Sequence, residues 1–200
     1  MIASKRDYRF YLEQDRKALG IKKPVGLLQR AKAIVAPHPI WKWERQLRRL
    51  EYLKNVEMKS KNPLRRIMGG VIYAIRKMEF RRNSTRLGFS ISPNCFGPGL
   101  SIAHYGTIIV NEAARVGANC RLHACVNIGA SGGSAKAPVI GDNVYIGPSA
   151  VIFGDIKIAS NVTIGANATV NKSCDTENVV LAGTPAKIVK EQVPNWIENR

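Results

Sequence analysis

The chain has 200 residues, of which 31 are Lys or Arg and 14 are Asp or Glu, and its formal net charge at pH 7 is +17. This length is enough for one well-packed core, or for one domain with an appendage. The first residues, MIASKRDYRF, lack the apolar run of a signal peptide, and no apolar segment is long enough to span a bilayer. We therefore expect a cytoplasmic protein.

The positive charge is concentrated in the first part of the chain. Residues 1–87 hold 23 Lys and Arg against 7 Asp and Glu, a net charge of +16. Residues 88–200 hold 8 against 7, a net charge of +1. Such an asymmetry predicts a basic N-terminal region over residues 1–87 and a nearly neutral domain over residues 88–190, followed by a C-terminal tail at residues 191–200.

The basic region is predicted to be helical. Ser4 and Asp7 resemble a capping box, and the helix that follows them is expected to end at Gly20. A short apolar stretch runs from Val25 to Val35. A further helix is indicated by apolar residues at helical spacing, namely Trp43, Leu47, Leu50 and Leu53.

A last helix begins at Asn62 and Pro63, which resemble a cap and a first-turn proline. Its apolar positions are Ile67, Val71, Ile75 and Met78. It also carries Arg65, Arg66, Arg76, Lys77, Arg81 and Arg82. Two interpretations stay open: a packed helix with a solvated basic face, or contact with an anionic membrane surface or a phosphorylated acceptor. No nucleic-acid recognition motif accompanies the charge, so we expect no nucleic-acid partner.

After residue 100 an aliphatic residue recurs at every sixth position. The series is Val110, Val116, Leu122, Ile128, Ile140, Ile146, Ile152, Ile158, Ile164 and Val170. A short fixed period of this kind indicates a solenoid, with two inward side chains per short strand and about 18 residues per three-stranded coil. The glycines that follow five of these residues suit corners that a β-carbon would resist. The pattern predicts a mainly β fold, a left-handed parallel β-helix preceded by the α-helical N-terminal region.

The series has one gap, between Ile128 and Ile140, where Ser134 stands at the expected aliphatic position. The segment NIGASGGSAKAP is small, polar and rich in glycine. The spacing fits either a degenerate strand in phase or a loop that leaves the prism. We favour the loop, because irregular backbone on a rigid scaffold is where binding residues concentrate.

The four cysteines show no CxxC pair and no disulfide framework. Cys120 and Cys125 lie within the repeat, and we expect both to be buried small apolar residues.

Two runs of the repeat region carry a resemblance to a known family. GPGLSIAHYGTIIVNEAARVGANCRLHACVNIG and NVYIGPSAVIFGDIKIASNVTIGANATVNKS, followed by AGTPAKIV, resemble the serine acetyltransferase type of hexapeptide-repeat acyltransferases over about residues 88–190. The resemblance implies a homotrimer or a dimer of trimers that uses acetyl-CoA and no metal, with active sites between neighbouring subunits. Many relatives in this subgroup are similar to enzymes of surface-polysaccharide assembly.

His104, in IAHYGT, matches the catalytic histidine of the family. Acetyl transfer to a hydroxyl requires a base, and an imidazole that titrates near neutrality is suited to this. His104 is, however, in phase with Val110 and Val116, and this simple register predicts an inward side chain.

His123 follows the inward Leu122 by one residue and should therefore face outward. It lies about one coil of 18 residues after Tyr105, which places it near His104. It either binds the acceptor or assists proton transfer, or it is a solvent-facing bystander. We also predict that Ser90, Tyr105 and Asn127 contact the substrate.

Three departures from the family pattern concern the acceptor. The aspartate that orients the base aligns roughly with Ser90, and the acidic residue before the catalytic histidine is Ala103 here. An Arg-His pair of the family's loop aligns with Lys136 and Ala137. Because the ammonium group of serine needs a carboxylate partner, we favour a sugar or glycan hydroxyl in surface polysaccharide biosynthesis. Serine, in cysteine biosynthesis, is the alternative.

The resemblance also implies a coenzyme path. In the loop it includes Gly129, Gly132, Gly133 and Lys136, whose amides and cation suit the thioester and phosphates. In the later coils it includes Gly147, Ala166, Gly183 and Lys187. Small residues at these later positions are equally explained by the demands of the fold.

Two other functions are weighed against acetyl transfer. A γ-type carbonic anhydrase on the same solenoid needs three histidines, but His38 lies outside the repeat and leaves only His104 and His123 within it. A non-catalytic scaffold, whose basic region docks a partner, predicts no binding of acetyl-CoA.

Overall fold

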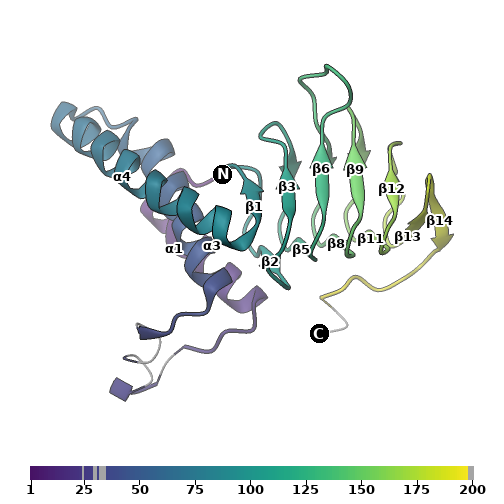
Figure 1. Cartoon of the computed structure of the whole chain (residues 1–200), viewed down its shortest axis with the longest axis horizontal. Helices are drawn as coiled ribbons and strands as arrows, with labels where there is room; N and C mark the ends of the chain where they lie inside the picture. Colours follow the sequence, from purple (N-terminus) through teal and green to yellow (C-terminus); the bar gives the residue numbers. More distant parts are fainter. Residues whose placement is uncertain (24, 29–30, 32–34, 198–200) are drawn as a thin grey trace.

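The computed structural model describes residues 1–23, 25–28, 31 and 35–197. It shows a helical region beside the first coil of a long prism of short parallel strands (Figure 1). The helices lie at one end, and the strands stack along the long axis away from them. The predicted fold class, a left-handed parallel β-helix preceded by an α-helical region, is confirmed.

The described helical elements are α1 (Lys5–Ala18), α3 (Pro39–Tyr52), the π-helical turn η1 (Leu53–Glu57) and α4 (Pro63–Leu87). The cap predicted for α1 is present, because the Ser4 hydroxyl accepts a hydrogen bond from the Asp7 amide at 3.0 Å. The apolar stretch predicted between Val25 and Val35 lies partly outside the described residues.

The helix α4 begins as predicted and runs further. The Asn62 side chain accepts a hydrogen bond from the Arg65 amide at 3.2 Å, and Pro63 occupies the first turn. The helix ends at Gly88, whose φ of 76° lies in the left-handed region that favours glycine. The apolar positions predicted for the preceding helix are all buried, namely Trp43, Leu47, Leu50 and Leu53.

The strands form three sheets, one on each face of the prism. Sheet A contains β1 (Phe89–Ile91), β3 (Ile108–Val110), β6 (Asn127–Gly129), β9 (Val151–Phe153) and β12 (Thr169–Val170). Sheet B contains β4 (Arg115–Val116), β7 (Val139–Ile140) and β10 (Lys157–Ile158). Sheet C contains β2 (Ser101–Ile102), β5 (Arg121–Leu122), β8 (Tyr145–Ile146), β11 (Thr163–Ile164), β13 (Val180–Gly183) and the antiparallel β14 (Ala186–Lys190).

The strand register confirms the predicted period in the later coils. Paired residues are 18 positions apart in each sheet, as in Ile140↔Ile158, Ile146↔Ile164 and Ile152↔Val170. All six side chains are buried inside the prism. Each strand thus places its recurring aliphatic directly above the one from the previous coil.

The repeat glycines have a different role from the predicted one. The left-handed corner positions are occupied by residues such as Asn143 and Asn161, with φ of 59° and 60°. A β-carbon on Gly147 would lie 2.8 Å from the backbone nitrogen of Ala166. Glycine is therefore needed there for the close approach of successive coils, not for an unusual φ.

The two cysteines of the repeat region differ in their burial. Cys120 is buried as predicted, and burial raises the pKa of its thiol well above the usual range. The prediction for Cys125 is wrong, because this residue occupies an exposed corner with φ of 62°.

The first coil is longer than the later ones. Ile102 pairs with Leu122, which lies 20 positions later in the chain. Val110 pairs with Ile128, which lies only 18 positions later. The turn at residues 103–107 therefore holds two positions more than the repeat requires. These two added positions shift the alternation of inward and outward side chains, and His104 is therefore exposed. The inward orientation predicted for His104 from the simple register is wrong for this reason.

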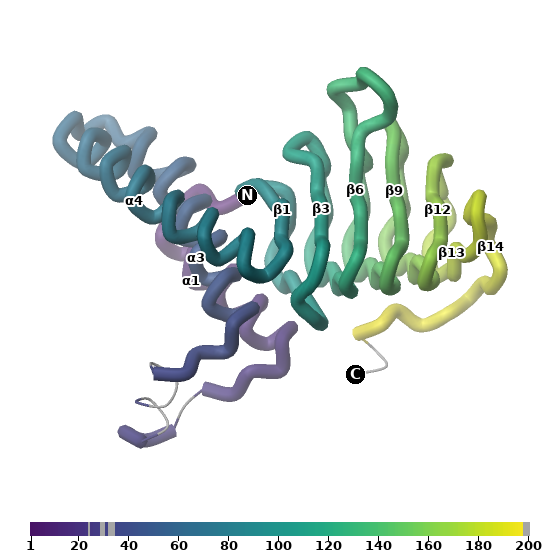
Figure 2. The backbone as a smooth tube through the Cα atoms, in the orientation of Figure 1, coloured from purple at the N-terminus to yellow at the C-terminus, as the bar shows by residue number. Residues whose placement is uncertain are grey.

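Residues 130–138 form the predicted loop. Val116 pairs with Ile140, and Ile140 pairs in turn with Ile158, so the coil that ends at Ile140 is longer by one full hexad than the regular coil after it. The extra chain leaves the prism between β6 and β7 and projects from the end of β6 (Figure 2). A degenerate strand in phase is not formed.

The C-terminal segment folds back beside the prism. The strand β14 pairs with β13 at the end of sheet C, and residues 191–197 then return along the same face (Figure 1). The indole Nε1 of Trp196 donates a hydrogen bond to the Asn119 carbonyl at 2.9 Å. Among the described helices, none combines the length and the apolar character needed to cross a bilayer.

A buried ionic network joins the helices to the first coil. Arg48 of α3 is 0% exposed, with its Nε 2.7 Å from a carboxylate oxygen of Asp15 and its Nη1 2.9 Å from one of Glu51. Its guanidinium also donates to the carbonyls of Phe96 and Gly97, at 2.9 Å and 2.6 Å. Although burial disfavours the charged guanidinium, the charges of Glu51 and Asp15 hold the pKa of Arg48 above its usual range.

Asp15 extends this network into the first coil. Its carboxylate accepts hydrogen bonds from the amides of Gly99 and Leu100, at 2.8 Å and 3.0 Å. One carboxylate of α1 is thus bonded both to α3 and to the backbone of the prism. The helical region and the β-helix are connected by charged groups with no solvent contact.

We predict that Arg48→Met destabilises the fold by about 3–5 kcal/mol, because it leaves two buried carboxylates without their cation. Arg45→Met, on the exposed side of α3, should change the stability by no more than about 0.5 kcal/mol. Urea denaturation of both variants and the wild type measures this difference. Equal midpoints for Arg48→Met and the wild type would contradict a structural role for the network.

Candidate active site

The turns that lead from sheet C to sheet A stack along one edge of the prism. We call this edge the histidine corner and define it by residues 103–107, 123–125, 147–149 and 165–167. Successive coils place His104 and His123 there. Because Ile102 and Leu122 are register partners, the residues that follow them leave sheet C side by side.

The two histidines are neighbours, as predicted. Their ring centroids are 6.1 Å apart, and the ring of His123 lies 5.1 Å from that of Tyr145 in β8. His104 is exposed, whereas His123 is half-buried. The corner thus presents one imidazole to solvent and holds a second behind it.

His123 is held in its neutral form. Burial lowers its pKa, and the nearby side chains of Arg121 and His104 lower it further. Its Nε2 atom is buried and has no hydrogen-bond partner within the described part of the chain. A neutral imidazole with an unpaired ring nitrogen can donate to or accept from a bound hydroxyl, depending on its tautomer.

No described residue of the chain orients the ring of His104. Its ring makes no hydrogen bond to any described residue, and the segment AHYGT around it contains no carboxylate. Ser90, the predicted counterpart of the family's aspartate, is exposed on β1 and lines a cleft beneath α4. His104 is not among the residues that line this cleft.

The other predicted substrate residues lie close to the corner along the chain. Tyr105 is 67% exposed in the same turn as His104. Asn127 begins β6, directly after the turn that carries His123, and is half-buried. Both positions are compatible with contact to a ligand at the corner.

The loop residues lie at the other end of β6. Because β6 runs from the histidine corner to the loop, Gly129, Gly132 and Gly133 sit across sheet A from His104. Lys136 is not a free cation, since its Nζ lies 2.6 Å from a carboxylate oxygen of Asp155. Within one protomer the structure does not bring the loop and the histidines together.

The coenzyme residues predicted in the later coils follow the edge of the prism. Gly147 and Ala166 belong to the histidine corner, while Gly183 ends β13 and Lys187 is exposed on β14. The tight approach at Gly147 is fully explained by coil packing. These positions therefore carry no independent sign of a ligand.

Sequence reasoning missed a cleft beside the corner. It has a volume of about 630 Å³ and lies between sheet C and the C-terminal segment, with Arg121, Tyr145 and Trp196 in its lining. Tyr145 connects it to His123. Arg121 and Tyr145 are register partners, and the coil between them contains the loop. The position of Tyr145 in this cleft could therefore be predicted only if the length of the loop were known.

No three His, Cys, Asp or Glu side chains gather as a metal-holding group among the described residues.

Comparisons with known proteins agree with this architecture. Residues 137–172 match the family described as bacterial transferase hexapeptide (six repeats). The chain is 34% identical over 130 residues to the serine acetyltransferase of Mycobacterium tuberculosis, covering 64% of this chain and 56% of that protein. It is 37% identical over 107 residues to that of Staphylococcus aureus, covering 52% and 50%.

Solved structures extend the likeness to the helical region. The serine acetyltransferase of Brucella abortus strain S19 matches 95% of this chain and 72% of its own, with a TM-score of 0.72 and 25% identity. The chain spans about half the length of the curated relatives it matches. These findings confirm the predicted resemblance: in its repeat sequence and in its fold, the chain is similar to hexapeptide-repeat acyltransferases of the serine acetyltransferase type.

Proposed function

We propose that the chain is an acetyl-CoA-dependent O-acetyltransferase with His104 as its general base. The observation that carries the proposal is the pair of adjacent imidazoles at one corner of a hexapeptide-repeat prism. The relatives are named serine acetyltransferases, and the Brucella abortus protein of similar fold was also solved in complex with coenzyme A.

The corner supports a direct transfer. His104 is exposed and can reach an acceptor hydroxyl, whose proton it takes as the oxygen attacks the thioester carbonyl. The tetrahedral intermediate then collapses, the carbon–sulfur bond breaks, and the imidazolium returns the proton to the departing thiolate. In this proposal the acceptor oxygen is held by the neutral His123, whose ring centroid lies 6.1 Å from that of His104.

Two acceptors are supported by different observations. The comparisons favour serine, the alternative in the sequence analysis, because the relatives carry that name and the Neisseria gonorrhoeae enzyme was solved with serine (25% identity, TM-score 0.64). The neutral sugar hydroxyl favoured in the sequence analysis is the second candidate. It is supported by the composition of the histidine corner, whose residues include no Asp or Glu to pair with an ammonium group.

We predict that His104→Ala lowers the acetyl-transfer turnover by about 10²–10⁴-fold without unfolding the chain. His38→Asn is the matched control, because His38 only caps α3 and asparagine can keep that cap. Release of free thiol from acetyl-CoA is followed with serine and with a panel of nucleotide- and lipid-linked sugars. Unchanged turnover in a folded His104→Ala variant would eliminate His104 as the base, and no binding of acetyl-CoA would favour the scaffold interpretation.

We further propose that the active enzyme is a homotrimer, or a dimer of trimers joined by the helical regions. The loop at residues 130–138 and the histidine corner lie at opposite ends of β6. A site that uses both therefore needs the loop of a neighbouring protomer.

Light scattering of the purified chain at micromolar concentration should give the mass of three or six copies. Shortening the loop between Ser131 and Ala135 should weaken acetyl-CoA binding, since the loop amides would no longer meet the corner of the neighbour. A monomer with full turnover would contradict a shared site.

The cytoplasmic localisation that we propose includes contact with an anionic membrane through α4. One face of this helix carries large apolar side chains that are each 54–66% exposed, namely Leu64, Ile67, Met68, Val71, Ile75 and Met78. The same helix has seven basic residues against Glu79 alone. An anionic surface attracts this charge and accepts the apolar stripe.

We predict that the chain co-sediments with vesicles that contain anionic lipid, more weakly at high salt and not with neutral vesicles. The double variant Val71→Glu and Ile75→Glu should lose this association. Val189→Glu, at an exposed apolar position on β14, should keep it. If the wild type ignores anionic vesicles at low salt, the face of α4 is better explained by contact between protomers.

A further inference from the structure

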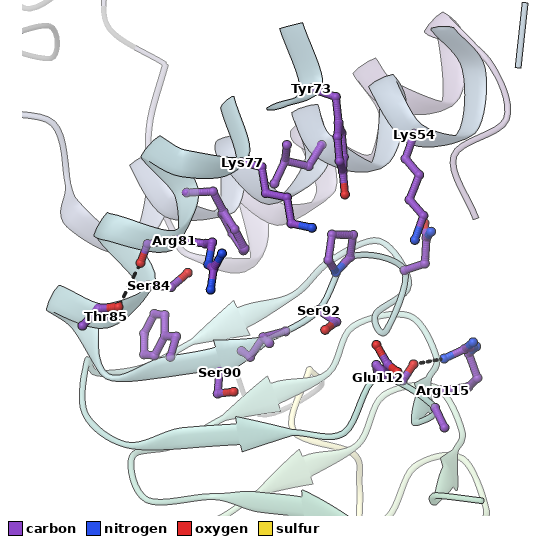
Figure 3. Close-up of a pocket in the computed structure, with 17 residues that line it drawn as sticks. Lys54, Tyr73, Lys77, Arg81, Ser84, Thr85, Ser90, Ser92, Glu112 and Arg115 are labelled. Carbon is purple, nitrogen blue, oxygen red and sulfur yellow. Dashed lines mark hydrogen bonds between the residues drawn. The ribbon is translucent and has the colours of Figure 1, made fainter. Parts of the chain in front are cut away.

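A second cleft lies away from the histidine corner, between α4 and the outer face of β1 (Figure 3). Its volume is about 690 Å³. The helix supplies Tyr73, Lys77 and Arg81, and the strand supplies Ser90. Figure 3 shows the tips of Tyr73, Lys77 and Arg81 directed from the helix toward the strand.

The cleft concentrates positive charge without neutralising it. Lys54, Lys77, Arg81 and Arg115 all line it, and Glu112 is its one acidic residue. None of these four cations forms an ion pair with a described residue. The guanidinium of Arg115 donates to the backbone carbonyls of Glu112 and Ala114 in its own turn.

Two cations of the same helix that lie outside the cleft are paired. Arg65 contacts Glu57, and Arg76 contacts Glu79 at 3.0 Å. The cleft differs from the rest of the helix in that its unpaired cations face one concave space together with hydroxyl groups.

Neutral hydrogen-bond donors accompany these cations. The hydroxyl of Ser90 is exposed in the cleft, and that of Ser84 accepts a bond from the Trp43 indole at 2.8 Å, which leaves its own hydrogen free to donate. Burial raises the pKa of Tyr73, so its phenol keeps its proton. Several cations and hydroxyl donors around one concave space are the groups that bind phosphate oxygens.

One end of the cleft approaches the acetyl-transfer site. Thr85 lines this end, and the nearby Leu87 carbonyl accepts a hydrogen bond from the Gly106 amide at 2.9 Å. Gly106 belongs to the turn that carries His104. A ligand in the cleft would therefore extend toward the histidine corner along the start of sheet A.

We propose that this cleft binds the phosphate or pyrophosphate group of a phosphorylated sugar acceptor. The inference rests on the proposed acetyl transfer and narrows its acceptor, because serine has no group that needs four unpaired cations. The charge fixes the anionic end of the acceptor beneath α4, and the sugar hydroxyl is directed to His104. The anion can come from a nucleoside diphosphate sugar or from a lipid diphosphate.

The test is calorimetric binding by the full chain at low salt, with inorganic pyrophosphate, UDP-glucose, farnesyl diphosphate and coenzyme A as separate probes. The double variant Lys77→Gln and Arg81→Gln removes two cleft cations. The matched control, Arg82→Gln with Arg86→Gln, removes the same charge from α4 outside the cleft. Circular dichroism verifies that both variants stay folded.

We expect the cleft variant to bind pyrophosphate at least about tenfold more weakly than the wild type, and the control to change by less than about twofold. Tighter binding of UDP-glucose or of farnesyl diphosphate than of pyrophosphate identifies the source of the anion. Equal affinity of the cleft variant and the wild type, or no binding by the wild type, would overturn the proposal.

Binding of coenzyme A tests whether the cleft holds the acceptor or the co-substrate. Its affinity should be the same in the cleft variant and the wild type, and an equal loss for coenzyme A would overturn the assignment to the acceptor. The binding measurement involves no acetyl transfer. A chain without acetyltransferase activity can therefore be distinguished from a chain whose cleft does not bind pyrophosphate.

Discussion

Arg48 is enclosed where the helices meet the first coil of the prism, and its charge is balanced there by Asp15 and Glu51. A buried guanidinium is tolerated only when its charge and its donors all find partners. These partners come from α1, from α3 and from the backbone of the first coil. The helices and the prism therefore have one relative position in which the charge is satisfied, and the placement of α4 over β1 follows from it.

Glu44 adds a third buried carboxyl group to the region around Arg48. It is fully buried beside the network, and neither of its carboxyl oxygens has a hydrogen-bond partner among the described residues. Burial, together with the nearby charge of Asp15, raises its pKa well above the usual range. This shift favours the neutral form of Glu44, in which Asp15 and Glu51 alone balance the charge of Arg48.

The regular part of the prism could be predicted from the sequence because each coil repeats the same steric demand. Ile140, Ile146 and Ile152 must stack on their counterparts in the next coil, and this requirement produces the six-residue spacing seen in the sequence. The caps at Ser4 and Asn62 are equally local, since the capping side chain and its amide are three positions apart.

The site was less predictable because it depends on interruptions of the repeat. The two added positions in the turn at 103–107 move His104 from the interior to the surface, and the hexad pattern has no signal for their number. The loop length decides that Tyr145 stands beside His123. The cleft beneath α4 depends on how a helix lies over a strand, and this is fixed by the distant Arg48 network.

The antiparallel strand β14 has a consequence for the behaviour of the chain at high concentration. A prism of parallel strands offers open backbone edges at both ends, and such edges can template fibre-like stacking of one molecule on another. The helical region covers the first end. At the other end of sheet C, β14 reverses direction and carries Lys187 and Lys190, so a second prism meets mismatched polarity and like charge. This single hairpin therefore protects sheet C against end-to-end polymerisation without adding another coil.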